Sequence, residues 1–270
     1  HQLFGRGIVR TVDNLGRTGE LPSHPELLDY LAIRLIERGW SVKSLVREIV
    51  LSRTFQLDSR TDADSFAIDP ENRWLWRVNR RRVSPEALRD TMLDAAGELH
   101  LARYDSTVSY LGDQATAVGD NKVRRRTDFP CRSVYLPVIR NDLPELFEVF
   151  DFANPHFATG MRPQTMVPTQ GLFLLNDESV MTTAQTLARR LLAGRDGRGD
   201  GALVDELFTR VFQSRPTEEE RGEVLAFLES TKKTQVEKTP ADRSPGDAEL
   251  SAWSQVCHAL FALSRFQILD

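Results

Sequence analysis

The chain has 270 residues, 40% of them hydrophobic, and carries 35 Lys and Arg against 39 Asp and Glu, for a net charge of −4. This length and apolar content are enough for a sizeable core, in one large domain or two small ones. The balanced charge lacks the basic bias of a general nucleic-acid binder, so we expect no nucleic-acid partner. No apolar run in the sequence approaches the roughly 18 residues needed to cross a bilayer.

Two helices with a short connection are predicted near the N-terminus. Ser23 and Glu26 have the spacing of a capping box, and Gly39 suits the left-handed end of the first helix. Ser41 can cap a second helix, whose apolar residues recur with helical spacing. Because only Trp40 separates the two, we expect a helical hairpin.

Two further helices follow this hairpin. One is predicted to begin near Asp69 and to carry Trp74, and the next begins at Ser84, where Pro85 fits the first helical turn. The stretch 103–130 has little periodicity and is expected to be a loop excursion.

A strand signal follows the excursion. The sequence Ser133–Ile139 is rich in β-branched and aromatic residues, and Pro137 would confine such a strand to an edge. We therefore expect at most a short edge strand or hairpin near 132–140.

The remaining predicted elements are helices. Asp142 opens a short one, and a long helical pattern from about 169 to 192 is broken near Asn176. Thr217 caps a later helix, and the polar stretch 231–247 is expected to be a linker before the last one. The sequence thus predicts a mainly α fold of about nine helices, in a single helical domain over 1–270.

The two cysteines, Cys131 and Cys257, lie in no CxxC or CxxCH arrangement, so the sequence offers neither a zinc knuckle nor a c-type haem attachment. They could form one disulfide or be two isolated buried thiols. We expect no metal site and no cofactor in this chain.

The most informative polar stretch is FDFANPHFATGMRPQT, Phe150–Thr165, between two predicted helices. Helix N-termini and the loops between rigid elements are common places for ligand sites. With its flanks, the stretch gathers candidate site residues over 140–176: Arg140, Asn141, Asp151, Arg162, Thr165 and Asn176.

The alternative interpretation of this stretch is structural, with the polar groups capping helices and tying loops. Phe150, Phe152, Phe157 and Met161 are then expected to turn into the core. Arg162 is expected to contact a carboxylate, with Asp151 as the first candidate.

A second candidate loop runs through FGRGIVRTVDNLGRTGE, Phe4–Glu20, with Arg6, Asp13 and Asn14, and with His24 just beyond it. Its arginines could grip an anion. The loop lacks both nucleotide-binding glycine motifs, and the alternative is an ordered loop that packs on the helical hairpin.

Several of these segments together form a recognisable set of motifs. They are FGRGIVRTVDNLGRTGELPSHPELLDYLA, GWSVKSLVREIVLSRTFQL, DPENRWLWRVNRRRVSPEALRD, RSVYLPVIRNDLPELFEVFDFANP and RPQTMVPTQGLFLLND. The set closely resembles the planctomycete C-terminal domain of unknown function, domain-of-unknown-function family 1553, from Leu3 to about Asp177 and more weakly beyond.

The resemblance implies a larger parent protein. In that family the domain usually ends an extracytoplasmic protein, after a companion uncharacterised domain and often a cytochrome c-like domain. Any haem is therefore expected only in an upstream domain of the parent. The first motif here begins inside its helix at His1, so we expect an N-terminal truncation that exposes Leu3, Phe4, Ile8 and Val9.

No activity is carried over with the resemblance, and two functional hypotheses stay open. The first is an accessory helical module that shapes a site shared with the upstream domain. The second is a catalytic domain, an oxidoreductase or hydrolase part that acts on polysaccharide-derived substrates through a polar pocket in 140–176. Convergence of the candidate residues in one concave pocket would favour the second.

Overall fold

The computed structural model describes residues 1–103, 129–140, 143–238 and 245–269. The chain divides into two compact units, and the single domain over 1–270 stays a prediction. Unit 1 comprises His1–Arg82, Ala158–Arg162 and Ile268–Asp270, and unit 2 comprises Val83–Phe157 and Pro163–Gln267. Helices dominate the described residues and the only sheet there has two strands, which confirms the mainly α fold.

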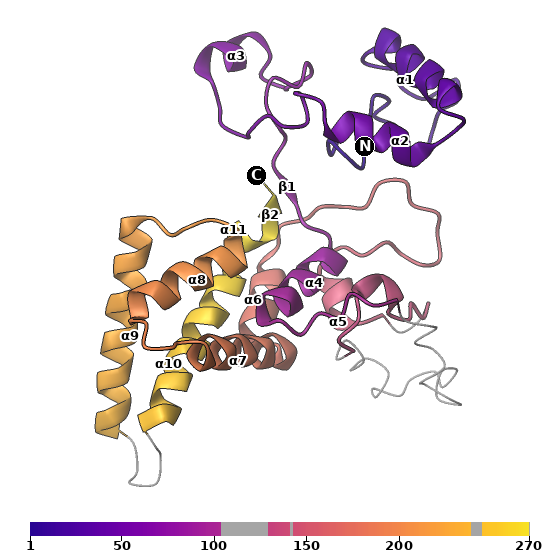
Figure 1. Cartoon of the computed structure of the whole chain (residues 1–270). Helices are drawn as coiled ribbons and strands as arrows, with labels where there is room; N and C mark the ends of the chain where they lie inside the picture. The colour runs from indigo at the N-terminus through magenta and orange to yellow at the C-terminus, as the bar shows by residue number, and fades with distance from the viewer. Residues whose placement is uncertain (104–128, 141–142, 239–244, 270) are drawn as a thin grey trace. The chain divides into compact units, whose positions relative to one another are not determined.

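Unit 1 contains a helical hairpin, one short helix and a small antiparallel sheet (Figure 1). Its elements are α1 (Pro25–Glu37), α2 (Val42–Val50), α3 (Ala63–Ile68), β1 (Arg81–Arg82) and β2 (Ile268–Leu269). The sheet pairs Arg81 with Leu269 and Arg82 with Ile268, which joins the C-terminal end of the chain to this unit.

The predicted hairpin of α1 and α2 is confirmed. Gly39 and Trp40 both adopt left-handed backbone angles in its turn, and Ser41 Oγ accepts a hydrogen bond from Ser44 N at 3.3 Å. The capping box predicted at Ser23 is wrong, because the N-cap of α1 is His24 and Ser23 Oγ donates instead to the Ile8 carbonyl. A long-range contact has replaced a local one.

Unit 1 buries no apolar side chain among its described residues. Its three buried residues are polar: Ser59, Asp69 and Asn72. Several apolar residues of the α1–α2 hairpin are exposed, and they are Leu27, Leu28, Tyr30, Ile33, Ile36, Trp40, Val42 and Val46. A helix that is apolar around most of its circumference normally lies in an interior, so the described residues of unit 1 leave part of the apolar surface of α1 uncovered.

The four N-terminal residues expected to be exposed by truncation are partly buried instead: Leu3, Phe4, Ile8 and Val9. The ring of Phe4, for example, packs edge to face on that of Phe55, with centroids 5.6 Å apart. The helices of unit 1 carry exposed apolar side chains, and in the N-terminal loop the exposed ones are Leu15 and Leu21, not these four.

The helix predicted from Asp69 is also wrong, because residues 69–80 form a series of turns. The buried carboxylate of Asp69 accepts hydrogen bonds from the backbone N–H groups of Arg73 and Trp74, at 2.9 and 2.8 Å. A short polar side chain that binds nearby backbone in this way competes with helix formation.

Unit 2 holds the remaining helices. They are α4 (Pro85–Ala96), the 3₁₀ helix η2 (Ser133–Tyr135), α5 (Glu145–Val149), α6 (Pro168–Asn176), α7 (Glu178–Ala193), α8 (Asp200–Phe212), α9 (Glu218–Lys238), α10 (Pro245–Ala262) and α11 (Ser264–Gln267). The predicted break near Asn176 is confirmed by the boundary between α6 and α7, where the Asp177 carboxylate caps α7.

The core of unit 2 lies around α7 and α10, which cross one another in the lower part of Figure 1. Trp253 and Phe261 of α10, Leu187 of α7 and Leu207 of α8 are fully buried. Burying such side chains is worth about 1.5–3 kcal/mol each, so this unit has its own apolar driving force.

The helix start predicted at Ser84 and the helix cap predicted at Thr217 are confirmed. Ser84 Oγ accepts from Ala87 N at the start of α4, at 3.2 Å. Thr217 and Glu220 form a reciprocal capping box before α9, at 2.7 and 3.2 Å. Helix occupies much of the predicted polar linker, since α9 continues to Lys238 and α10 begins at Pro245, while most of the predicted excursion lies outside the described residues.

The edge strand predicted at 133–139 is wrong, because Ser133–Tyr135 is a turn of 3₁₀ helix. Ser133 donates from both its backbone N and its Oγ to Asp90 Oδ1, at 2.8 and 2.7 Å. Arg89, only 3% exposed, donates to the Cys131 carbonyl and to Ser133 Oγ. These contacts from α4 determine the local backbone in place of its β-propensity.

Candidate functional site

The stretch 150–165 is anchored by two of the four apolar side chains expected to anchor it. Phe150 is 2% exposed and meets Phe173 edge to face, and Phe152 stacks on Phe147 with ring centroids 4.8 Å apart. Phe157 and Met161 are 73% and 54% exposed, so the expectation that they point into the core is wrong. The rigid part of the stretch is therefore its beginning.

Three polar side chains link the two ends of this stretch within unit 2. Asp151, with φ of 61°, accepts from Thr165 N at 2.8 Å and from Thr165 Oγ1 at 3.0 Å. The buried Gln170 donates to Thr165 Oγ1 and to the Val149 carbonyl, at 3.2 and 3.0 Å. A buried amide with this many partners stabilises a loop closure. We call Asp151, Thr165 and Gln170 the polar hub.

The other candidates from 140–176 have local or separate environments. Asn176 Nδ2 donates to the Leu172 carbonyl of its own helix at 2.7 Å. Arg140 is exposed, and Asn141 lies outside the described residues. Arg162 belongs to the segment of unit 1, whereas Asp151 belongs to unit 2, so their pairing stays a prediction.

The second candidate loop is ordered largely by its own hydrogen bonds. Asn14 Oδ1 accepts from Gly16 N, its Nδ2 donates to Thr18 Oγ1, and its carbonyl accepts from Thr11 Oγ1. The Gly19 backbone approaches the Asn14 carbonyl so closely that a Cβ on Gly19 would lie 2.1 Å from its oxygen. Such a close approach explains the glycine, and it describes a compact structural loop.

One contact joins the two candidate stretches inside unit 1. Asp13 Oδ1 accepts a hydrogen bond from Gly160 N at 2.7 Å, although the residues are 147 positions apart. A Cβ on Gly160 would lie 2.2 Å from the same oxygen, so only glycine fits there without a shift. Asp13 therefore attaches the second part of the 150–165 stretch to the N-terminal loop.

Arg6 and His24 bind other neighbours. Arg6 donates to the Glu71 carbonyl at 3.0 Å, and the Glu71 carboxylate lies 3.5 Å from Arg6 and 3.6 Å from Arg10. His24 Nδ1 lies 2.9 Å from Ser23 Oγ, and its ring meets that of Trp74 edge to face at 5.1 Å. The four candidates of this loop thus have four different sets of contacts.

Sequence reasoning missed a buried polar cluster at 69–79. Asn72 is 1% exposed, with φ of 51°, and its side chain binds the Arg77 backbone and Asn79 Oδ1 at 2.8 and 2.9 Å. Asp69 binds the intervening backbone, and Trp76 Nε1 donates to the Asp69 carbonyl. The turn-forming composition of Asp-Pro-Glu-Asn was the available signal. We call Asp69 and Asn72 with their bonded backbone the polar turn cluster.

The two cysteines are buried free thiols. Burial raises the pKa of the Cys257 thiol far above its ordinary value, and burial also raises the pKa of Cys131 despite the nearby Arg89 guanidinium. A thiol with a raised pKa is a poor nucleophile, so neither cysteine suits covalent catalysis. No group of three or more His, Cys, Asp or Glu within the described ranges could hold a metal ion.

The candidate side chains therefore close loops and join distant segments. Asp151, Thr165 and Gln170 bind one another and backbone, and Asp13, Asn14 and Asn176 bind backbone or near neighbours. These contacts can position loops rigidly, and they supply neither a nucleophile next to a base nor a set of metal ligands.

The described residues define a mainly helical chain in which unit 2 has an apolar core and unit 1 buries no apolar side chain. None of its described helices is long and apolar enough to span a membrane. A family model described as protein of unknown function (DUF1553) matches residues 1–228, and the chain belongs to that family. No curated protein and no solved structure matches the chain.

Proposed function

We propose that the chain is an accessory helical module that docks through unit 1 onto the domain that precedes it in a longer protein. In this proposal the parent is extracytoplasmic and associated with a cytochrome c-like domain, which would hold any haem. The docked unit 1 helps to shape a site that the two domains share.

The supporting observation is the absence of buried apolar side chains from the described residues of unit 1, next to the well-buried core of unit 2. Ile33 and Ile36 of α1 are 56% and 57% exposed, and Trp40 after α1 is 70% exposed. Exposed apolar side chains gathered on one hairpin favour an interaction site, because their burial is the main driving force of association.

The charges of the hairpin favour a protein partner over a lipid surface. Residues 24–50 carry Glu26, Asp29, Glu37 and Glu48 against Arg34, Arg38, Lys43 and Arg47, so the hairpin has no net charge. Helices that lie on membranes are rich in Lys and Arg on their polar face. A neutral, ion-paired apolar hairpin is more typical of a protein interface.

The catalytic alternative receives no support from the described contacts of 140–176. Asp151 and Thr165 bind one another, and Asn176 binds its own helix. A catalytic pocket needs polar groups that converge on a space where substrate could bind.

The test is binding between this chain and the separately produced upstream domain, measured by calorimetry. Replacement of both Ile33 and Ile36 by Lys should abolish binding while the chain keeps its helical circular dichroism, because both side chains are already exposed. Leu263→Lys, at a 46% exposed position of unit 2, is the matched control and should bind normally. Undetectable binding of the unmodified chain would refute the proposed function.

A further inference from the structure

A second exposed feature of unit 1 lies beside the start of α1. The side chain of Trp74 is 67% exposed, although its backbone is held rigidly by the Asp69 carboxylate. Its ring meets the ring of His24, the N-cap of α1, at 90°. Trp74 therefore lies beside the N-terminal end of α1.

The backbone around Trp74 is constrained by the polar turn cluster. Asn72 and Leu75, on either side of Arg73 and Trp74, both have positive φ, 51° and 53°. A leucine in the left-handed region is strained by about 1 kcal/mol or more, and such strain persists only where the surroundings impose it. Here the hydrogen bonds of the buried Asp69 and Asn72 side chains impose the strained backbone conformation. In that conformation the Trp74 side chain is exposed to solvent.

The sequence around this tryptophan is rich in arginine. Residues 71–82 contain five arginines and a single carboxylate, that of Glu71, which already lies between Arg6 and Arg10. Among the described residues no carboxylate pairs with Arg73, Arg77 or Arg81. Arg77 lies over the Trp76 ring at 5.1 Å, and Arg81 donates to the neutral Gln2 carbonyl at 2.7 Å.

We propose that Trp74, with Arg73 and Arg77, anchors the docking of an acidic protein surface that receives the indole in an apolar pocket. The inference rests on the proposed function and names the chemistry of the partner surface. Interface energy concentrates in Trp and Arg side chains near the centre of a contact, and rigid presentation lowers the entropy lost on binding. The two guanidinium groups, which have no carboxylate partners among the described residues, match a surface rich in Asp and Glu.

The nearby acids favour a protein over a nucleic acid as the occupant. Glu26 and Asp29, in the first turns of α1, are exposed, and the Glu71 side chain is 71% exposed. Closely spaced phosphates would be repelled by these carboxylates, whereas a protein surface can place its acids opposite the arginines alone.

The experiment measures the affinity of the upstream domain for four forms of the full chain, at low and at high salt. Trp74→Ala should weaken binding about 30-fold, as expected of an interface hot spot. The double variant with Arg73→Glu and Arg77→Glu should weaken it at least about tenfold and should flatten the dependence of affinity on salt. Ile68→Ala, at an 86% exposed position of the same unit, is the control and should bind normally.

The outcomes separate this inference from the proposed function. If the unmodified chain does not bind the upstream domain, the proposed function and this inference both fail. If it binds, and the Trp74 and arginine variants bind equally well, docking stands and the inference is wrong. A single-stranded oligonucleotide serves as a second probe: binding that is lost in the arginine variant would assign the patch to nucleic acid and overturn the inference.

Discussion

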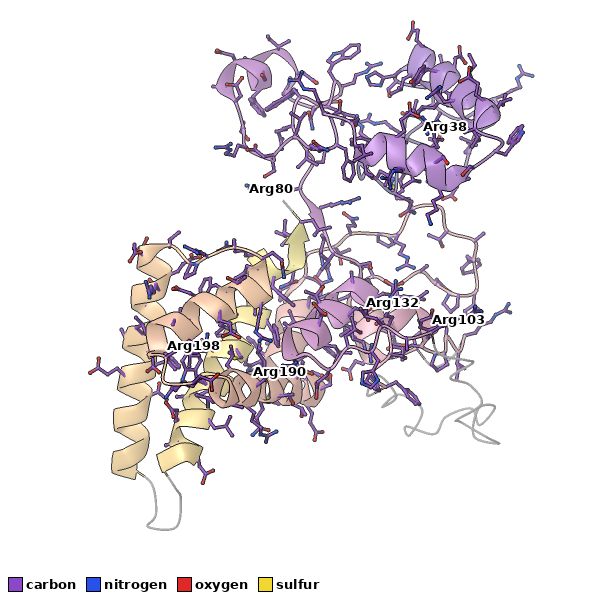
Figure 2. The ribbon with its side chains drawn as sticks, in the orientation of Figure 1. Arg38, Arg80, Arg103, Arg132, Arg190 and Arg198 are labelled. Atoms are coloured by element: carbon purple, nitrogen blue, oxygen red, sulfur yellow. The ribbon has the colours of Figure 1, made fainter. Side chains whose placement is uncertain are left out.

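Unit 1 and unit 2 are built from similar amphipathic helices but are held together in different ways. Unit 2 buries aromatic and aliphatic side chains from α4, α6, α7, α8 and α10 in one continuous core. Unit 1 buries Ser59, Asp69 and Asn72 and no apolar side chain among its described residues. Charged contacts reinforce its hairpin: Arg38, labelled in Figure 2, and Arg34 both reach Glu48 of α2, at 2.6 and 3.4 Å.

This difference indicates how far the stability of each unit depends on contacts with another protein or domain. Apolar burial is the dominant favourable term in folding, and surface ion pairs contribute about 0–1 kcal/mol each. Unit 2 meets that requirement internally. Unit 1 has little apolar burial of its own, so its stability is expected to increase on association, as the proposed docking requires.

The largest expected effect tests the core of unit 2. Trp253→Ala should lower the free energy of unfolding by about 3–5 kcal/mol, because it leaves a large cavity at a fully buried position. Trp253→Phe should cost less than half as much, since Trp253 Nε1 has no hydrogen-bond partner among the described residues. Denaturant unfolding followed by circular dichroism measures both.

The control for this prediction is Trp74→Ala in unit 1, which should change the free energy of unfolding by no more than about 0.5 kcal/mol. The reaction of the buried thiols with a maleimide gives an independent readout, because opening of unit 2 exposes Cys257. Equal losses for the two tryptophans would break the contrast between the units.

A smaller loss is expected in the polar turn cluster of unit 1. Asn72→Ala should destabilise the unit by about 2–3 kcal/mol, since it strands the Arg77 backbone groups and forces alanine into a left-handed conformation. Hydrogen exchange of the 69–79 amides measures the loss locally. Asn154→Ala, at an exposed turn, is the control and should have little effect; protection that survives in the Asn72 variant would contradict a polar core.

Two glycine substitutions should change stability in opposite directions. Gly160→Ala should destabilise unit 1 by about 1–2 kcal/mol, because its Cβ would collide with Asp13 Oδ1. Gly222→Ala, in the exposed part of α9 with no atom near its Cβ, should stabilise unit 2 by about 0.5–1 kcal/mol. Thermal unfolding measures both, and a Gly160 variant as stable as the unmodified chain would show that the contact with Asp13 is dispensable.

The smallest expected effect is the pH dependence of stability, to which a carboxylate in each unit contributes. Hydrogen bonds from Thr217, with the Arg265 guanidinium, lower the pKa of Glu220 below its ordinary value, and hydrogen bonds from Ser65 lower the pKa of Asp62. The ionised forms favour the native state, so their contributions are complete above the ordinary pKa values and are lost as the pH falls through the lowered ones. For the partly exposed Glu220 the contribution should be below about 0.5 kcal/mol after solvent screening.

An acid titration of stability measures this effect. Glu220→Gln should reduce the loss of stability between neutral pH and about pH 3, whereas Glu219→Gln, a neighbour in the exposed first turn of α9, should leave it unchanged. If the two variants titrate alike, the capping box at Thr217 makes no charge-dependent contribution.

The sequence alone was sufficient for structure whose cause is local. Ser41 and Thr217 cap their helices as predicted, and α4 begins after Ser84 as predicted, because each helix start needs only a side chain and the next few backbone N–H groups. The mainly α class and the α1–α2 hairpin follow from helical spacing and a short connection for the same reason.

Where a long-range contact overrides a local structural preference, only the tertiary structure determined the outcome. Ser133 does not lie in a strand, because Asp90 binds it from 43 positions away, and Ser23 does not cap α1, because it binds the Ile8 carbonyl. The contact between Asp13 and Gly160 has no local signal at all. Residue spacing cannot encode such contacts, because the packing of whole elements brings the two partners together. At Ser23, the long-range hydrogen bond also competes directly with the local capping bond that the sequence predicts.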